Sequence, residues 1–252
     1  MIREKLIDKG VGDPHKFRWR SHEISRIEGL SDAVFAFAVT LLVVSLEVPK
    51  TFAELMTAMR GFGAFAVCFT LLFIVWFNQY KFFRRYGLED NLTVLINGAL
   101  LFVVLFYVYP LKFLFTFLVD RFTGGHGEVR LPNRTVESMI ETPEQIATLM
   151  IIFSAGYIAV FGVFALLYWH AYRKRKQLDL NALEMFDTRA DIRESLLNVS
   201  IAVVALAIAV FGGRFAPASG MVFMLTAIVL SVHGAINGRR RRQLENLVTP
   251  QS

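Results

Sequence analysis

The sequence predicts an all-α membrane protein with six transmembrane helices. Hydrophobic residues make up 55% of the 252 residues and charged residues 19%, whereas soluble domains average about 45–50% and about 25%. The mean hydropathy is +0.48, and the apolar residues gather in six long runs. Each run is near the roughly 20 residues that a helix needs to cross a bilayer. Lysine and arginine residues lie mainly between the runs, as expected for loops outside the hydrocarbon.

Six helices follow from these runs, taken in order along the chain. The first run ends at Pro49, and the second has an amphipathic lead-in that starts at Phe52. Pro110 lies inside the third run, where a proline either kinks a helix or marks its exit from the hydrocarbon. The sixth run stops before Arg239–Arg242, a basic stretch of the kind that halts translocation and attracts anionic headgroups. The predicted helices span residues 24–48, 61–80, 92–119, 146–169, 195–213 and 217–237.

The connecting segments predict the topology. Of the 27 lysines and arginines, 20 lie on the side that holds both ends of the chain and seven on the other side. Positive residues favour the cytoplasm, so both termini are predicted to be cytoplasmic, which requires an even number of crossings. We therefore expect a basic cytoplasmic N-terminus over 1–23, a six-helix membrane domain over 24–238 and a basic cytoplasmic tail over 239–252. The longest outer connection, 120–144, predicts a surface loop with a short hairpin or helix.

Composition argues against several functional classes. The net charge of +6 follows the membrane topology, so no nucleic-acid partner is expected. The single cysteine, Cys68, excludes an internal disulfide and a CxxC metal site. The five histidines are scattered and no HExxH pattern occurs, so we expect no metal site, no cofactor and no enzyme activity. A purely structural membrane protein stays open at this point.

The first helix carries the unusual residues. Arg26, Glu28, Ser31 and Asp32 occupy its first third, so that Asp32 lies well inside the helix. Polar groups are costly inside a membrane unless protein or water satisfies them, and intramembrane polar residues therefore mark functional or structural sites. We place the function on this helix.

Helical geometry divides this helix into two faces. At about 100° per residue, seven residues share one stripe, and Asp32 lies on the opposite side. By spacing alone, a stripe of leucine, phenylalanine and valine with one threonine is a packing face or a lipid face. The stripe consists of Arg26, Leu30, Ala33, Phe37, Thr40, Leu41 and Val44.

Motifs in the first three helices extend this interpretation. The first helix reads Arg26-x-x-x-Leu30-Ser31-Asp32 followed by AVFAFAVTLL. It resembles the RxxxFSD signature of the endolysosomal potassium channel family, also called transmembrane protein 175, and of its prokaryotic relatives. The likeness continues with WFNQYKFF, which begins at Trp76, and with NLTVLIN and a Tyr-Pro pair in the third helix. It covers about residues 26–115.

The resemblance implies a homotetramer in the plasma membrane of a prokaryote. The first helices would line a central pore that favours potassium among monovalent cations, with no cofactor. The family lacks the TVGYG filter of ordinary potassium channels, and this chain lacks that sequence too. Matching positions place the hydrophobic constriction at Phe37, with Leu41 and Val44 as further pore-facing residues, and assign selectivity to Thr40.

Three positions depart from the family pattern. The motif phenylalanine is Leu30 here, and the constriction residue, usually isoleucine or leucine, is Phe37. Four phenyl rings around an axis would form a narrower gate that excludes water more readily. Gln79 stands where the family usually has a histidine, which removes a group that titrates near neutral pH.

The other polar residues of the first three helices are predicted to form a structural network rather than to bind ions. Arg26 could also line the cytoplasmic mouth, although a ring of arginines repels cations. Glu47 lies near the outer mouth, where it either concentrates cations or serves as an ordinary interfacial carboxylate. The predicted network consists of Arg26, Ser31, Asp32, Trp76, Gln79 and Asn97.

Together these features predict a potassium-favouring cation channel with a hydrophobic gate on the first helix. The alternative is a secondary transporter, proton-coupled in one version, that uses Arg26 and Asp32 as carriers. Transporters usually contain inverted repeats and helices that are interrupted near the membrane midplane. The sequence has no convincing internal repeat, and its first helix has no central glycine or proline break.

Overall fold

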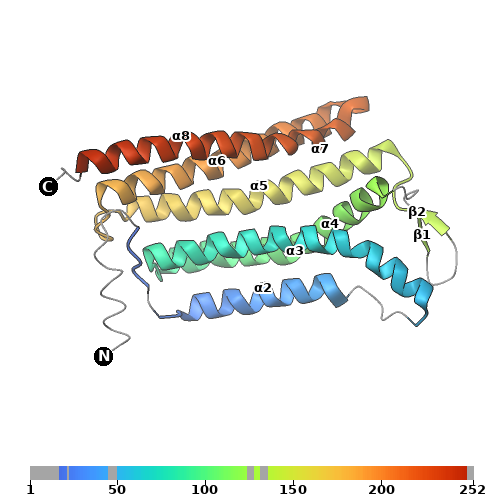
Figure 1. Ribbon diagram of the computed structural model, residues 1–252, viewed down its shortest axis with the longest axis horizontal. Coiled ribbons are helices and arrows are strands. Elements are labelled where there is room, and N and C mark those ends of the chain that lie inside the picture. Colours follow the sequence, from blue (N-terminus) through green and yellow to red (C-terminus); the bar gives the residue numbers. More distant parts are fainter. Residues whose placement is uncertain (1–16, 22, 45–49, 124–127, 131–135, 249–252) are drawn as a thin grey trace.

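The computed structural model describes residues 17–21, 23–44, 50–123, 128–130 and 136–248. Long helices dominate it and lie side by side (Figure 1). They are α2 (Arg26–Val44), α3 (Phe52–Tyr86), α4 (Asn91–Phe122), α5 (Pro143–Arg173), α6 (Ala182–Phe211) and α8 (Met224–Val248). The shorter elements are strands β1 (Glu128–Arg130) and β2 (Val136–Ser138), the 3-10 helix η1 (Gly213–Ala218) and helix α7 (Ser219–Val222).

Each predicted membrane segment corresponds to one of the long helices. Within the described residues, five helical regions are long and apolar enough to cross a membrane, and the shortest holds 26 residues. Helix α2 is described over 19 residues, and its length of about 28 Å, at 1.5 Å per residue, is close to the roughly 30 Å hydrocarbon core. The described chain begins and ends at the same end of the bundle (Figure 1), as an even number of crossings requires.

The second half of the bundle departs from the predicted boundaries. Helix α6 begins at Ala182 rather than near residue 195. Its first turns are charged, and their low hydropathy had placed them in a loop. The fifth segment ends at Phe211, just before Gly213, which has a φ of +50°. The sixth segment is not one straight helix, since Pro217 lies in η1 and the short α7 precedes α8. Helix α8 continues past the predicted end at residue 237 to Val248, because arginine is a good helix former.

Side-chain caps determine where two of the helices begin. At α2, Ser25 Oγ accepts from the backbone N–H of Glu28 at 3.2 Å, and the Glu28 carboxylate accepts from the backbone N–H of Ser25 at 2.9 Å. At α6, Asn181 and Glu184 form the same reciprocal pair. This arrangement satisfies backbone donors that have no partner inside the first helical turn.

The connection between α4 and α5 contains an antiparallel hairpin. Strands β1 and β2 pair so that Val129 lies opposite Glu137. The hairpin agrees with one of the two predictions for residues 120–144, and no helix forms in the described residues between α4 and α5. Helix α5 then begins with Pro143, a residue that suits the first turn of a helix.

The core lies where α3, α4 and α5 meet, and α2 lies at its edge. Phe82, Leu100 and Leu167 come one from each of these three helices and are fully buried. Small residues allow close helix contact, and a Cβ on Gly156 would lie 2.2 Å from the ring of Tyr107. Helix α2 packs against α3 and α4, which leaves its other side uncovered by the described chain (Figure 1).

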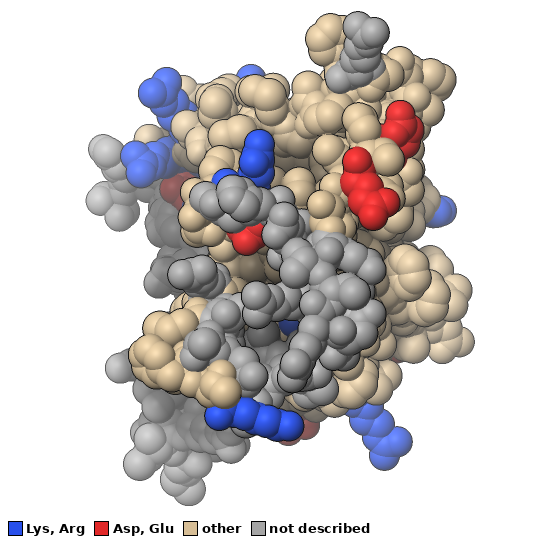
Figure 2. Space-filling model, turned by 90° about the vertical axis from the view of Figure 1, so that its right-hand side faces the viewer, with Lys and Arg blue, Asp and Glu red and all other residues tan. Residues whose placement is uncertain are grey.

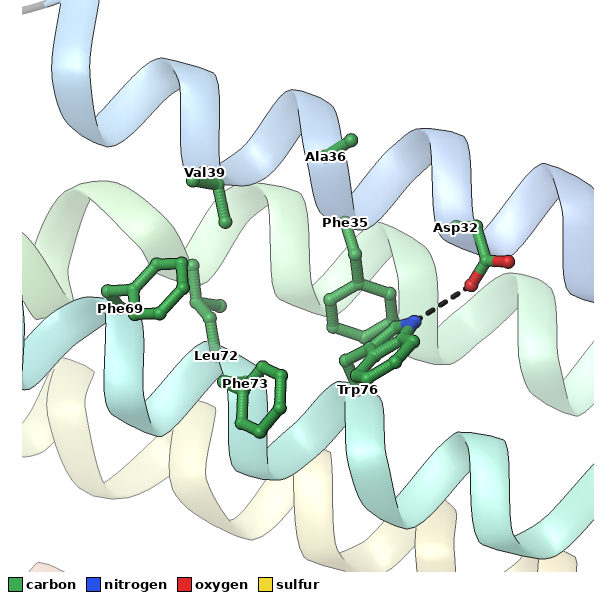
Figure 3. Close-up of a pocket in the computed structure, with 8 residues that line it drawn as sticks. All are labelled: Asp32, Phe35, Ala36, Val39, Phe69, Leu72, Phe73 and Trp76. Atoms are coloured by element: carbon green, nitrogen blue, oxygen red, sulfur yellow. Dashed lines mark hydrogen bonds between the residues drawn. The ribbon is translucent and has the colours of Figure 1, made fainter.

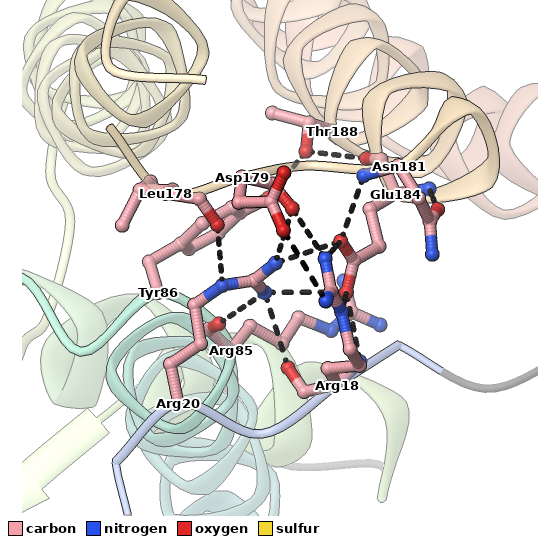
Figure 4. A network of polar contacts seen from close by, with 9 residues as sticks. All are labelled: Arg18, Arg20, Arg85, Tyr86, Leu178, Asp179, Asn181, Glu184 and Thr188. Carbon is pink, nitrogen blue, oxygen red and sulfur yellow. Dashed lines mark hydrogen bonds and ion pairs between the residues drawn. The ribbon is translucent and has the colours of Figure 1, made fainter. Parts of the chain in front are cut away.

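The described N-terminal segment, 17–21, is fastened to the start of α6 (Figure 4). Glu184 is 1% exposed and accepts hydrogen bonds from Arg18 Nη2 at 3.1 Å and from Arg20 Nη2 at 2.7 Å. The backbone N–H of Arg20 donates to the carbonyl of Arg84 at 3.0 Å. These contacts connect the residues that lead into α2 with the ends of α3 and α6.

Candidate functional site

Helix α2 has one buried face and one exposed face. The buried face packs on α3 and α4 and recurs at intervals of three or four residues, the period of an α-helix. Its residues are Glu28, Ser31, Phe35, Ala38 and Leu42.

The stripe predicted from the sequence coincides largely with the exposed face. The side chains of Leu30 and Phe37 are 61% and 56% exposed, and Arg26, Ala33 and Thr40 are also exposed. In a membrane, an apolar face without a partner from its own chain contacts lipid, another subunit or a pore. The described chain therefore leaves this stripe available for a pore axis.

Three further residues predicted for the pore or its outer mouth are not placed on the exposed face by the described part of the chain. Leu41 is half-buried, between the two faces of α2. Val44 is the last residue of α2, and its side chain is not among those described. Glu47 lies outside the described residues. The pore-facing and outer-mouth roles of these residues stay predictions.

Thr40 carries a hydroxyl group on the exposed stripe, and its oxygen can interact with a cation. Its hydroxyl donates to the carbonyl of Ala36 at 2.9 Å. That bond uses the single hydrogen of the hydroxyl, so the remaining polar capacity of the side chain is the lone pairs of its oxygen. An exposed oxygen with free lone pairs is the kind of group that hard cations prefer as a ligand.

Ser31, Gln79 and Asn97 form a buried polar network between α2, α3 and α4. Gln79 Nε2 donates to Asn97 Oδ1 at 2.7 Å, and Asn97 Nδ2 donates to Ser31 Oγ at 3.0 Å. Ser31 Oγ in turn donates to the carbonyl of Ile27 at 2.8 Å. The three side chains of the network belong to residues that are at most 2% exposed. Such satisfied contacts between helices fix how α2 is rotated against its neighbours.

Asp32 has a partner from α3. It accepts a hydrogen bond from Trp76 Nε1 at 2.8 Å. The pair lies at one end of a groove of about 410 Å³ between α2 and α3, whose other lining residues, including Phe69 and Phe73, are apolar (Figure 3). Trp76 is one of the residues predicted for the polar network, and the structural role of Asp32 stays a prediction.

Arg26 stands apart from the network. It is the first residue of α2 and belongs to the exposed face. Within the described chain, no hydrogen bond or ion pair joins it to Asp32, whose carboxylate is bound by Trp76. The carrier pair that the transporter alternative requires is therefore not assembled in the described residues.

Two charged residues that hold α2 were not assigned to the polar network from the sequence. Glu28 is 7% exposed, and its Oε1 lies 3.7 Å from Arg84 Nε. Lys112 Nζ donates to the carbonyl of Leu42 at 2.7 Å, near the other end of α2. The Ser-x-x-Glu spacing that begins at Ser25 could have revealed Glu28. From the sequence, Lys112 was counted only as one of the seven basic residues on the outer side.

Replacing Asn97 with alanine is expected to lower the free energy of unfolding by about 1–2 kcal/mol, because Gln79 and Ser31 lose their partner in a buried site. Unfolding of the purified protein in a denaturing detergent measures the effect. The matched control is Asn91→Ala, since Asn91 is exposed at the start of α4. Equal stability of the two variants would show that the network does not hold the helices together.

Comparisons with known proteins bear on the same region. The family model of the endosomal/lysosomal potassium channel TMEM175 matches residues 26–107, which include the exposed stripe and the buried network. A potassium channel of Marivirga tractuosa is 38% identical over 244 residues, which are 95% of this chain and 98% of that protein. A potassium channel of Streptomyces collinus is 22% identical and matches 85% of this chain and 90% of its own length.

Two solved structures share the fold. A variant of the potassium channel MtTMEM175, in complex with a nanobody–MBP fusion protein, has a TM-score of 0.77 and 40% identity and covers 90% of this chain and 98% of its own. A homologue of the lysosomal potassium-selective channel TMEM175 from Chamaesiphon minutus has a TM-score of 0.55 and 21% identity. It covers 86% of this chain and 99% of its own. These relatives are ion channels and not enzymes, as the prediction for this chain also states.

Proposed function

Because this chain belongs to the TMEM175 potassium channel family, we propose that it conducts potassium through a pore lined by helix α2. Family membership rests on the 38% identity that extends over 95% of the chain. One observation supports the choice of α2: its regularly spaced face, with Leu30, Phe37 and Thr40, is left exposed by the described chain. A pore-lining helix needs such a face at the edge of its subunit.

Four copies around an axis would each direct the exposed face of α2 towards the centre. The groove between α2 and α3 then provides a surface on which a neighbouring copy packs. An aromatic row borders it, with ring centroids 6.2 Å apart for Phe69 and Phe73 and 5.4 Å apart for Phe73 and Trp76. Rows of large rings bury much apolar area at an interface. The proposed homotetramer lies in the plasma membrane of a prokaryote, with both termini in the cytoplasm.

Phe37 forms the hydrophobic constriction of the proposed pore. Its side chain is 56% exposed on the stripe, and four such rings would meet near the axis. A ring of apolar side chains passes ions only when it is wide enough to stay wet. The buried network of Ser31, Gln79 and Asn97 keeps α2 in the rotation that directs Phe37 inward.

Selectivity in this pore rests on Thr40, because the chain contains no TVGYG sequence that could form a carbonyl filter. Replacing Thr40 with alanine removes a ring of hydroxyl oxygens and is expected to lower the potassium-to-sodium permeability ratio. Flux of each ion into liposomes that contain the purified protein measures this ratio.

The control for this substitution is Thr70→Ala. Thr70 is exposed on α3, and its hydroxyl makes the same kind of bond, to the carbonyl of Ala66 at 2.8 Å. The ratio is expected to stay at the wild-type value in this variant. Equal ratios in the wild type and in both variants would contradict the role of Thr40.

Cysteine substitutions along α2 test which face meets water. Leu30, Ala33, Phe37 and Thr40, each replaced by cysteine, are expected to react with a water-soluble thiol reagent in the reconstituted protein. Phe35, Ala38 and Leu42 are buried and are expected to stay protected. The native Cys68 is fully buried, so its background reaction is small.

A lipid-facing position separates exposure to water from exposure to hydrocarbon. Phe106 is 68% exposed on α4, and Phe106→Cys is expected to be inert because the reagent does not enter the membrane. Reaction at Phe106→Cys but not at the stripe would mean that α2 faces lipid.

A further inference from the structure

An apolar cavity lies at the end of the bundle opposite the described chain ends, away from the network that holds α2. It has a volume of about 550 Å³ and lies between α4, α5 and the η1–α7–α8 region. Every residue that lines it is apolar or glycine. Its volume falls within the roughly 300–1,000 Å³ typical of ligand sites.

The break in the sixth segment opens this cavity. The short elements η1 and α7 take the place of a straight helix between Gly213 and Val222. Gly220, in α7, has no side chain to fill the space, and a Cβ there would meet only Met150 Sδ, at 3.6 Å. The wall of the cavity includes Phe153 and Phe223, whose ring centroids lie 4.9 Å apart with planes at 84°.

The depth of the cavity matches one leaflet of a bilayer. Its lining runs along α4 from Leu114 to Phe122 and along α5 from Ile146 to Phe153. The lining reaches about 12 Å from the end of α4 and about 15 Å from the start of α5, at 1.5 Å per residue. Half of the hydrocarbon core is about 15 Å thick. The cavity therefore lies where the acyl chains of one leaflet lie.

The residues around the cavity suit a flexible apolar chain with a phosphate at its end. Met150, Met221 and Met224 line it, and methionine side chains adapt to irregular partners. Arg121 is exposed in the last turn of α4, next to Phe122 of the lining. Arg121 lies three residues after Leu118 and seven after Leu114, on the face of α4 that lines the cavity, and a guanidinium there can act as a local anchor for an anion. Figure 2 shows this end of the bundle, where other charged groups are also exposed.

We propose that this cavity binds one acyl chain of a phospholipid, whose phosphate pairs with Arg121. The occupant is a lipid rather than a second copy of the chain, because the cavity is an apolar recess at leaflet depth and Arg121 lies on the same face of α4 as its lining. This site is separate from the ion pathway on α2.

Native mass spectrometry of the full-length protein, extracted from vesicles of phosphatidylglycerol or phosphatidylcholine, tests the proposal. Gly220→Leu fills the cavity and is expected to retain about tenfold less phospholipid, a change of ~1.4 kcal/mol in binding free energy. Gly234→Leu is the control, since a Cβ on this glycine of α8 meets nothing within 4 Å. Equal retention of lipid by the two variants would overturn the proposal.

Two further variants test the headgroup and the identity of the occupant. Arg121→Gln is expected to abolish the preference for phosphatidylglycerol over phosphatidylcholine, and an unchanged preference would remove Arg121 from the site. Met221→Cys, labelled with a benzophenone, is expected to crosslink to lipid, whereas a crosslink to a second chain would identify the cavity as a subunit interface. Neither readout is ion flux, so both are independent of the proposed channel activity.

Discussion

Replacing Phe37 with alanine is expected to raise potassium flux through the reconstituted protein by about tenfold or more, the effect of lowering the barrier by ~1.4 kcal/mol. Phe37 is 56% exposed on the α2 stripe, and four phenyl rings at an axis would exclude water from the constriction. Alanine widens that ring and lets it stay wet. Potassium uptake into liposomes, at equal protein density for both forms, measures the change.

The control for this prediction is a phenylalanine on the outside of the bundle. Phe106 is 68% exposed on α4, and Phe106→Ala removes the same ring without touching α2. Its flux is expected to equal that of the wild type. If the wild type, Phe37→Ala and Phe106→Ala all conduct equally, or are all silent, Phe37 does not form the constriction.

Replacing Glu184 with alanine is expected to cost about 3 kcal/mol of unfolding free energy, the lower end of the range for removing one partner of a buried ion pair. Glu184 is 1% exposed and accepts from Arg18 and Arg20 (Figure 4). The arginine side chains keep 36% and 17% exposure, so water reduces part of the cost. Denaturant unfolding of the purified protein gives the value.

Asp179→Asn is the matched control for Glu184→Ala. The Asp179 carboxylate lies 3.6 Å from Arg18 Nη1, but its side chain is 94% exposed, and exposed pairs contribute little. Its φ of 46° is also tolerated by asparagine. We expect this variant to unfold like the wild type. A loss of stability as large as that of Glu184→Ala would mean that burial does not govern this cluster.

The apolar runs and the helical period made much of this fold predictable. The six segments follow from hydropathy, and the two faces of α2 follow from the 3.6-residue repeat. For residues 120–144 the sequence left a hairpin and a helix open. Family membership followed from the motif at Arg26–Asp32. These features are local in sequence, which is why a single chain reveals them.

The features that were not predicted depend on contacts between distant residues. The charged start of α6 is helical because Glu184 and Asn181 cap the helix. Glu184 also pairs with Arg18 and Arg20, which lie far away in sequence. The break at Gly213 and the contact of Lys112 with α2 likewise depend on tertiary packing. Arg26 was placed in the polar network on its motif position, but its helical angle directs it to the opposite face.

The measurement that tests the central claim most directly is the symmetry of the purified protein in a lipid environment, determined by electron cryomicroscopy. The account predicts a four-fold assembly in which α2 of each copy lies at the axis and Phe37 and Thr40 point towards it. A different symmetry, or α2 on the lipid-facing perimeter with another helix at the axis, would contradict it.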